Sequence, residues 1–167
     1  MSSARAAGSS AALAAVLVAA GCGSSGNARA LVAQAQRGLA RIHSGTITVH
    51  ASADTPVPLG RTVTLQASEI PLRRVDLLAL TSHARRVSCE PGLECAKADI
   101  DVKRALRAFR PLLPPLPVDP KSVHDATIQV ALAGGKPRYL RLTGKVDAGF
   151  LLGDVPFTVV LDLPRPG

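Results

Sequence analysis

Residues 126–163 read ATIQVALAGGKPRYLRLTGKVDAGFLLGDVPFTVVLDL, and apolar residues alternate with polar ones along most of this segment. A period of two is typical of β-strands that bury one face. Gly134-Gly135 separates the first alternating run from the second, and Asp147-Ala148-Gly149 begins the connection to the third. Three strands with short connections predict an antiparallel meander. Its apolar face should be covered and its polar face should contact water.

Further strands are predicted upstream of this meander. Thr46–Ala53 and Arg61–Glu69 alternate in the same way, and Arg85–Ser88 and Ala96–Ile100 form two short apolar–polar runs. Residues 71–82 are apolar on both faces of an extended chain. We expect a strand covered on both sides there, with a short helix as the alternative.

Two helices are predicted from apolar residues at helical spacing. In the first, Leu31, Ala35, Leu39 and Ile42 share one face, and we expect it to begin with a cap at Asn27 and to stop at Ser44-Gly45. The second opens at Asp101. Its apolar face consists of Val102, Ala105, Leu106 and Phe109. Its basic face consists of Lys103, Arg104, Arg107 and Arg110.

Together these elements predict an α+β fold, in which a curved antiparallel sheet (a half-barrel) packs against one or two α-helices. A single domain should span residues 28–167, a length that permits a sizeable apolar core. Only one Tyr, three Phe and no Trp are present. The core must therefore consist mainly of Leu, Val, Ile and Ala.

The first 22 residues read MSSARAAGSSAALAAVLVAAGC, with a positive charge at Arg5 and an apolar run from Ala11 to Ala20. Such a pattern indicates an export signal peptide. The apolar run is shorter than the roughly 20 residues of a permanent membrane span. Ala19-Ala20-Gly21-Cys22 resembles the bacterial lipobox, except that Ala19 stands where Leu is usual. We therefore expect a lipoprotein signal peptide at 1–21, an acylated Cys22 and a flexible tether over 22–27; an ordinary signal peptide is the alternative.

The charge balance is basic. The chain has 20 Lys and Arg against 12 Asp and Glu, and removal of Arg5 with the signal peptide leaves 19 − 12 = +7. A basic exported domain favours anionic surfaces such as phospholipid headgroups or acidic envelope polymers. Nucleic acid is not expected as a partner, because the chain carries an export signal and no recognition motif.

Three cysteines are present, and acylation of Cys22 would leave Cys89 and Cys95 as a pair. Pro91-Gly92 between them favours a turn that brings the two thiols together. A disulfide is expected in an oxidising compartment. A redox pair or a metal site is less favoured, because the spacing is not CxxC and no second cysteine pair or nearby histidine completes a zinc site.

Catalytic patterns are absent from the sequence. The four histidines, His43, His50, His83 and His124, have no metal-binding spacing, and no nucleophile elbow or phosphate loop occurs. Gly134-Gly135-Lys136 reads as a hairpin turn. We expect neither an enzyme nor a cofactor or metal site.

The order of elements resembles the LppX/LprG-type lipoproteins of actinobacteria and the LolA/LolB lipoprotein carriers. The residues that carry this likeness are Cys22, the helix-to-strand passage from Ala30 to Val49, and the closing strands Pro137–Val146 and Val155–Leu163. The resemblance implies a curved half-barrel sheet that encloses a hydrophobic cavity for acyl chains. This chain is shorter than typical members and carries the Cys89–Cys95 insert.

We therefore expect a lipoprotein on the outer side of a cell membrane that binds a lipid or another amphiphile. The expected lipid contacts are Leu77, Leu78, Leu80, Phe109, Leu112 and Leu113. The basic helix and the apolar loop after it either pack on the sheet, with solvated arginines, or rest on the membrane. The alternative function is an anchored interaction or structural module in the envelope, whose protein partner the sequence does not identify.

Overall fold

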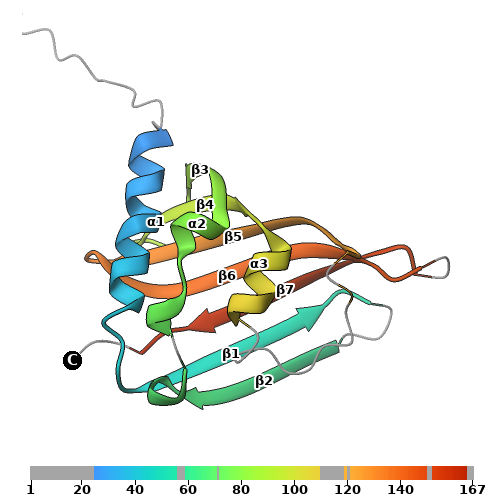
Figure 1. Ribbon diagram of the computed structural model, residues 1–167, viewed down its shortest axis with the longest axis horizontal. Helices are drawn as coiled ribbons and strands as arrows, with labels where there is room; N and C mark the ends of the chain where they lie inside the picture. The colour runs from blue at the N-terminus through green and yellow to red at the C-terminus, as the bar shows by residue number, and fades with distance from the viewer. Residues whose placement is uncertain are drawn as a thin grey trace, which may run out of the picture.

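The computed structural model describes residues 25–55, 59–70, 72–109, 119, 121–149 and 152–164. These form an open, seven-stranded antiparallel sheet with the order β2-β1-β7-β6-β5-β4-β3. The strands are β1 (Thr46–Ala53), β2 (Leu59–Gln66), β3 (Thr81–Val87), β4 (Glu94–Ile100), β5 (Val123–Ala133), β6 (Lys136–Asp147) and β7 (Asp154–Asp162). The helices α1 (Ser25–Leu39), α2 (Leu77–Leu80) and α3 (Val102–Phe109) all lie on one face of this sheet (Figure 1). The predicted α+β class is confirmed, with sheet as its main component.

The predicted meander is strands β5, β6 and β7. Ile128 lies opposite Leu142, which in turn lies opposite Val159, so one apolar row crosses all three strands. Gly134 and Gly135 make the β5–β6 turn with φ angles of +53° and +79°. Backbone of this kind suits glycine, because it lacks the Cβ that makes left-handed conformations costly.

The two faces of the sheet differ as the alternation predicts. We call the face toward the helices the inner face. Its central residues, which are buried to 6% exposure or less, are Ile47, Val49, Ala96, Ala98, Ile128, Val130, Leu140, Val159 and Leu161. The outer face is mainly polar, as with Thr127 and Thr143, whose hydroxyl oxygens lie 2.9 Å apart in a hydrogen bond.

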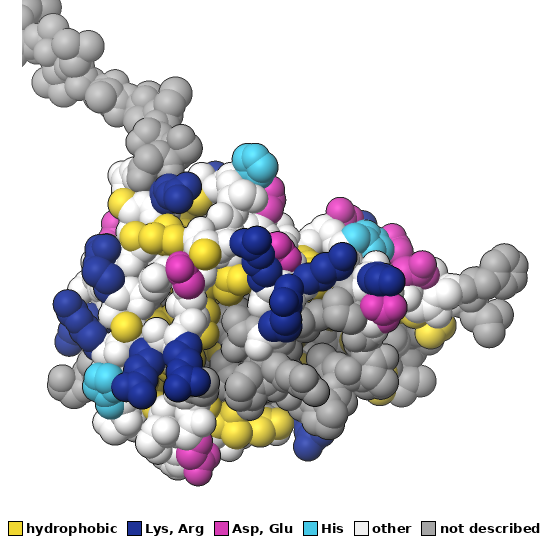
Figure 2. Space-filling model, viewed as in Figure 1, with side chains coloured by type: hydrophobic (Ala, Val, Ile, Leu, Met, Phe, Trp, Pro, Cys, Tyr) yellow, Lys and Arg dark blue, Asp and Glu magenta, His cyan; other side chains and the backbone are white. Residues whose placement is uncertain are grey.

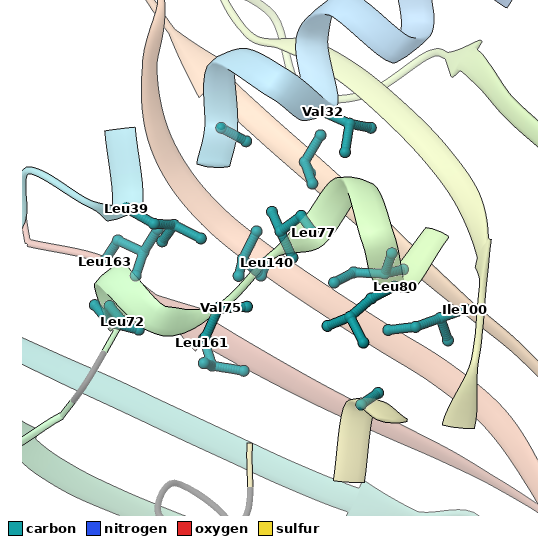
Figure 3. Close-up of a cluster of buried hydrophobic side chains, with 14 of the residues drawn as sticks. Val32, Leu39, Leu72, Val75, Leu77, Leu80, Ile100, Leu140, Leu161 and Leu163 are labelled. Carbon is teal, nitrogen blue, oxygen red and sulfur yellow. The ribbon is translucent and has the colours of Figure 1, made fainter. Parts of the chain in front are cut away.

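Helix α1 covers one half of the inner face. It packs mainly against β3, β4, β5 and β6, and the apolar side chains of Leu31, Val32 and Leu39 are buried to 3% exposure or less. Figure 3 shows Val32, Leu77 and Leu140 meeting in the layer between the helices and the sheet. Each such side chain stabilises the fold by about 1.5–3 kcal/mol when fully buried.

The structure corrects the predicted start of the first helix. Helix α1 begins at Ser25, so Asn27 lies inside it and does not cap it. The predicted tether over 22–27 is thus helical in its last three residues. Burial of Ala28, which is 0% exposed, explains the longer helix, because its first turns already pack on the core.

The segment after β2 is also corrected. Residues Ala67–Glu69 (η1) and Leu72–Arg74 (η2) are 3₁₀ turns, and Leu77–Leu80 is the short helix α2. The strand interpretation of 71–82 is therefore wrong over residues 72–80, where the alternative, a short helix, is present. Asp76 caps α2 by accepting a hydrogen bond from the Ala79 amide at 3.0 Å. Leu77 and Leu80 are buried on one side of this turn, which accounts for apolar residues at both strand parities.

Helix α3 follows the prediction. Asp101 precedes it and accepts a hydrogen bond from the Arg104 amide at 3.1 Å, which is the arrangement of an N-cap. Ala105 is 3% exposed and joins the core, while Lys103, Arg104 and Arg107 are exposed. The basic side of the helix therefore faces away from the sheet.

Candidate functional site

The residues expected to contact lipid occupy three different settings. Leu77 and Leu80 are core residues at 0% and 7% exposure, and Leu78 is half-buried. Leu112 and Leu113 lie outside the described residues, as does the side chain of Phe109. The acylation site, Cys22, lies outside them as well.

The predicted disulfide between Cys89 and Cys95 is present, with the two Cα atoms 6.2 Å apart. It closes the β3–β4 connection, where Gly92 adopts a φ of +83° and the Leu93 amide donates to the Glu90 carbonyl at 3.1 Å. Cys95 is 3% exposed and packs with Ala131 and Tyr139 on the outer face. The bridge thus joins a hairpin to a small apolar cluster.

An apolar strip remains partly uncovered on the inner face, at the end of the sheet beyond α1. We define the inner strip as Leu59, Val63 and Leu65 of β2 together with Ala53 of β1 and Phe157 of β7. Leu59 lies opposite Ala53, which in turn lies opposite Phe157, so these side chains share one face. Leu59 is 60% exposed and the other four are half-buried.

The inner strip differs in burial from the rest of the same sheet rows. Val63 lies in one row with Val49, Leu161 and Leu140, which are exposed by 1%, 6% and 1%. Among the described residues, the exposure of this row therefore rises only at the edge strand β2. Arg61 stands between Leu59 and Val63 on the same face and is exposed, so the strip combines apolar surface with one cation.

A depression of about 370 Å³ lies where the strip ends, beside the last residue of β2. Its lining consists of Ile42, His43, Ala67, Ser68, Glu69, Ile70, Arg73 and Arg74. Buried Ala67 and Ile70 form an apolar floor, while the charged side chains are exposed. The Ala67 amide donates to the Gly45 carbonyl at 2.8 Å, which ties the η1 turn to the start of β1.

The sequence around Arg73 and Arg74 explains how the depression acquires its charge. Leu72 and Val75 are 1% and 4% exposed, and the Val75 amide donates to the Leu72 carbonyl at 3.0 Å. These two anchors fix the turn from both sides and leave the two arginines between them exposed. Figure 2 shows basic side chains gathered beside a histidine over this corner of the molecule, at the lower left.

Three histidines pair with carboxylates across strands. His50 lies between Thr62 (Nδ1 to Oγ1, 3.0 Å) and Asp162 (Nε2 to Oδ2, 3.4 Å) on the outer face. His83 and Asp99 are 3.1 Å apart. The hydroxyl–imidazole–carboxylate set at His50 resembles a nucleophile relay in composition. However, the His50 and Asp162 side chains are 49% and 44% exposed, so water competes for every contact.

His124 forms the third pair, with its Nε2 3.1 Å from Asp154 Oδ2. The hydrogen bond to Asp154 raises the pKa of His124 above its ordinary value of 6.5. Protonation of His124 would make its hydrogen bond to Asp154 charge-assisted, near the start of β5. This pair is exposed, and it lies on strands whose inner residues fill the core.

No protein-family model matches this sequence, and no curated protein matches it. Within the described ranges, no helix combines the length and the apolar character that crossing a bilayer requires. The strip was predictable in part from the alternation at 59–66, whereas the depression joins residues 42–43 to residues 67–74 and was missed.

Proposed function

We propose that this chain is an exported lipoprotein, acylated at Cys22 on the outer side of a bacterial cell membrane, and that its domain binds lipid acyl chains on the inner strip. The observation that carries the proposal is the exposed apolar strip at the open end of the sheet. Leu59 is 60% exposed although it lies on the face that elsewhere forms the core.

The strip has the size and the chemistry of an acyl-chain site. From Leu59 to Leu65 the strand advances six residues at about 3.3 Å each, or about 20 Å. One leaflet of a bilayer has about 15 Å of hydrocarbon, half of the roughly 30 Å core. An acyl chain along the strip would therefore contact Leu59, Val63 and Leu65, with Arg61 between the first two. In this proposal the open sheet serves as a half-barrel, with lipid on its inner side.

The uncovered strip is a better site than the layer between α1 and the sheet. Leu77 and Leu80, which we expected at a cavity wall, already pack into the core at 0% and 7% exposure. A lipid could reach them only if α2 moved away from its contacts with Gln36, whose side-chain oxygen accepts a hydrogen bond from the Leu78 amide at 3.0 Å. No contact among the described residues would have to break for a lipid to reach Leu59, which is 60% exposed.

The test is whether the protein carries lipid. The full chain with Cys22→Ser, exported without acylation, would be purified gently and examined by native mass spectrometry with lipid extraction. We expect bound acyl lipid that added fatty acid or phospholipid displaces. Purification of an empty protein that takes up no offered lipid would contradict the proposal.

A second function, an anchored interaction module without a small-molecule ligand, is favoured by the filled core beneath α1 and α2. The outer face supplies a polar surface for it, with Arg141 stacked over the Tyr139 ring at 5.2 Å and Gln129 donating to the Tyr139 hydroxyl at 3.3 Å. The empty-protein outcome above would support this function. Neither proposal includes catalysis, a cofactor or a nucleic acid.

A further inference from the structure

We infer that the depression at the end of the inner strip binds the phosphate of a phospholipid headgroup, with Arg73 and Arg74 as its ligands. This inference rests on the proposed function, because it adds a headgroup site to the acyl-chain site. Two observations carry it: the charge of the depression, and its position relative to the strip.

The depression carries more basic than acidic side chains. Three basic side chains of the domain form ion pairs: Arg86 with Glu94 at 2.8 Å, Arg104 with Asp101 at 3.4 Å, and Lys145 with Asp125 at 3.3 Å. Among the residues that the structure describes, Arg73 and Arg74 form no ion pair.

The lining contains Glu69 besides the two arginines, so these three side chains sum to +2 − 1 = +1. An anion is therefore favoured there. Arginine suits a phosphate better than a simple cation does, because its planar guanidinium donates paired hydrogen bonds to phosphate oxygens.

The position of the depression selects a lipid phosphate. Leu65, the last apolar residue of the strip, precedes Ala67 on the floor of the depression by two residues. A chain lying along β2 would therefore place its polar end at the arginines. The volume of about 370 Å³ is at the lower end of the range for small-molecule sites, and it has room for a headgroup phosphate with its ester oxygens.

The test compares two variants that lose the same charge. Arg73→Ala/Arg74→Ala removes the proposed ligands, and Arg85→Ala/Arg86→Ala removes two adjacent arginines from β3, at the opposite edge of the sheet. Both are made in the full chain with Cys22→Ser. Binding is measured by flotation with vesicles of digalactosyldiacylglycerol, a neutral lipid without phosphate, that contain either phosphatidylglycerol or oleate, at matched negative charge.

We expect Arg73→Ala/Arg74→Ala to bind the phosphatidylglycerol vesicles at least about tenfold more weakly, because the paired hydrogen bonds from guanidinium to phosphate are lost. Arg85→Ala/Arg86→Ala should bind them nearly as the parent does. Equal losses in both variants would mean diffuse attraction and would overturn the inference, as would no loss in either. An equal effect on oleate vesicles would remove phosphate as the ligand.

Two further arms separate the sources of failure. Displacement of the vesicles by inorganic phosphate at a concentration comparable with that of lipid phosphate would assign the depression to free phosphate and overturn the lipid assignment. Uptake of a neutral monoacylglycerol reports on the strip alone. If the parent chain takes up the monoacylglycerol and Arg73→Ala/Arg74→Ala binds phosphatidylglycerol vesicles as the parent does, the headgroup inference fails and the proposed function stands. If the parent chain takes up no monoacylglycerol, the proposed function itself is contradicted.

Discussion

Leu65 of β2 lies directly opposite Ile47 of β1, yet Ile47 is completely buried whereas Leu65 is only half-buried. Both side chains point to the inner face, so the difference arises from the elements above them. Helix α1 packs mainly on β3–β6 and does not pack on β2, which is the edge strand at the other end of the sheet. The inward-facing positions of β2 are still apolar at Leu59, Val63 and Leu65, although these side chains are not fully buried. These partly exposed apolar side chains form the strip.

We predict that Leu77 is a structural residue. Leu77→Ala should lower the free energy of unfolding by about 2–5 kcal/mol, because it leaves a cavity in the core. Leu59→Ala, at a position 60% exposed, should change it by about 0.5 kcal/mol or less. Urea unfolding compares the two variants. Equal small effects would contradict the filled layer between α2 and the sheet.

Removal of the disulfide should destabilise the domain moderately. The bridge spans six residues of sequence separation, and closing so short a loop contributes about 2 kcal/mol on the chain-entropy relation. The matched variant is Cys89→Ser/Cys95→Ser, whose unfolding midpoint would be compared with that of the parent under non-reducing conditions. Lipid uptake should be retained, because the bridge lies on the outer face. A loss of uptake in a folded variant would refute a purely structural role.

The His124–Asp154 pair should make stability depend on pH. Because Asp154 raises the pKa of His124, the protonated pair stabilises the folded state. This contribution is fully present below the unfolded pKa of about 6.5 and is lost as the pH rises through the folded pKa. Asp154→Asn should lower the pKa of His124 toward its ordinary value and reduce the difference, because Asp154 is its largest cause and only the smaller effects of Ser122 and Asp125 remain. NMR titration of the imidazole measures this directly, and an unchanged pKa in the variant would show that Asp154 is not the cause.

The anchor is tested by fractionation. We expect Cys22→Ser to release the chain into the soluble fraction or to leave an uncleaved precursor. The reason is that lipoprotein acylation supplies more than one acyl chain, whereas a single acyl chain binds membranes only marginally, at about 10⁴ M⁻¹. Mutation of Cys95, which is buried on the outer face, is the control for loss of a cysteine as such. Normal processing with unchanged membrane association would rule out acylation at Cys22.

Much of the fold was predictable because the strands of this chain bury one face. Residues 46–53 were assigned to their observed bounds, and the meander, α3 and the cysteine hairpin also agree. The helix at Leu77–Leu80 was predictable only as the alternative to a strand, because Leu77 and Leu80 fit a strand covered on both sides as well as a single helical turn. The choice depends on tertiary contacts, such as the bond from the Leu78 amide to Gln36.

The depression was not predictable for a related reason. Its charge depends on Arg73 and Arg74, which lie in a 3₁₀ turn between two buried anchors, and its other side comes from Ile42 and His43 after α1. No spacing in the sequence relates these two segments. Only the β1–β2 pairing, which returns the chain to the start of β1, places them together.

Binding of acyl chains on the inner strip can be tested by substitutions on the two faces of one strand. Leu59→Asp and Val63→Asp place a carboxylate on the inner face, whereas Thr64→Asp places the same charge on the outer face of β2. Leu59 is already 60% exposed, so its variant should remain folded. Uptake of a fluorescent fatty acid by the Cys22→Ser chain is the measurement. We expect both inner-face variants to lose uptake, because burying a carboxylate against hydrocarbon costs several kcal/mol. Thr64→Asp should retain uptake. Uptake by folded Leu59→Asp and Val63→Asp at the level of Thr64→Asp would contradict binding on the inner strip.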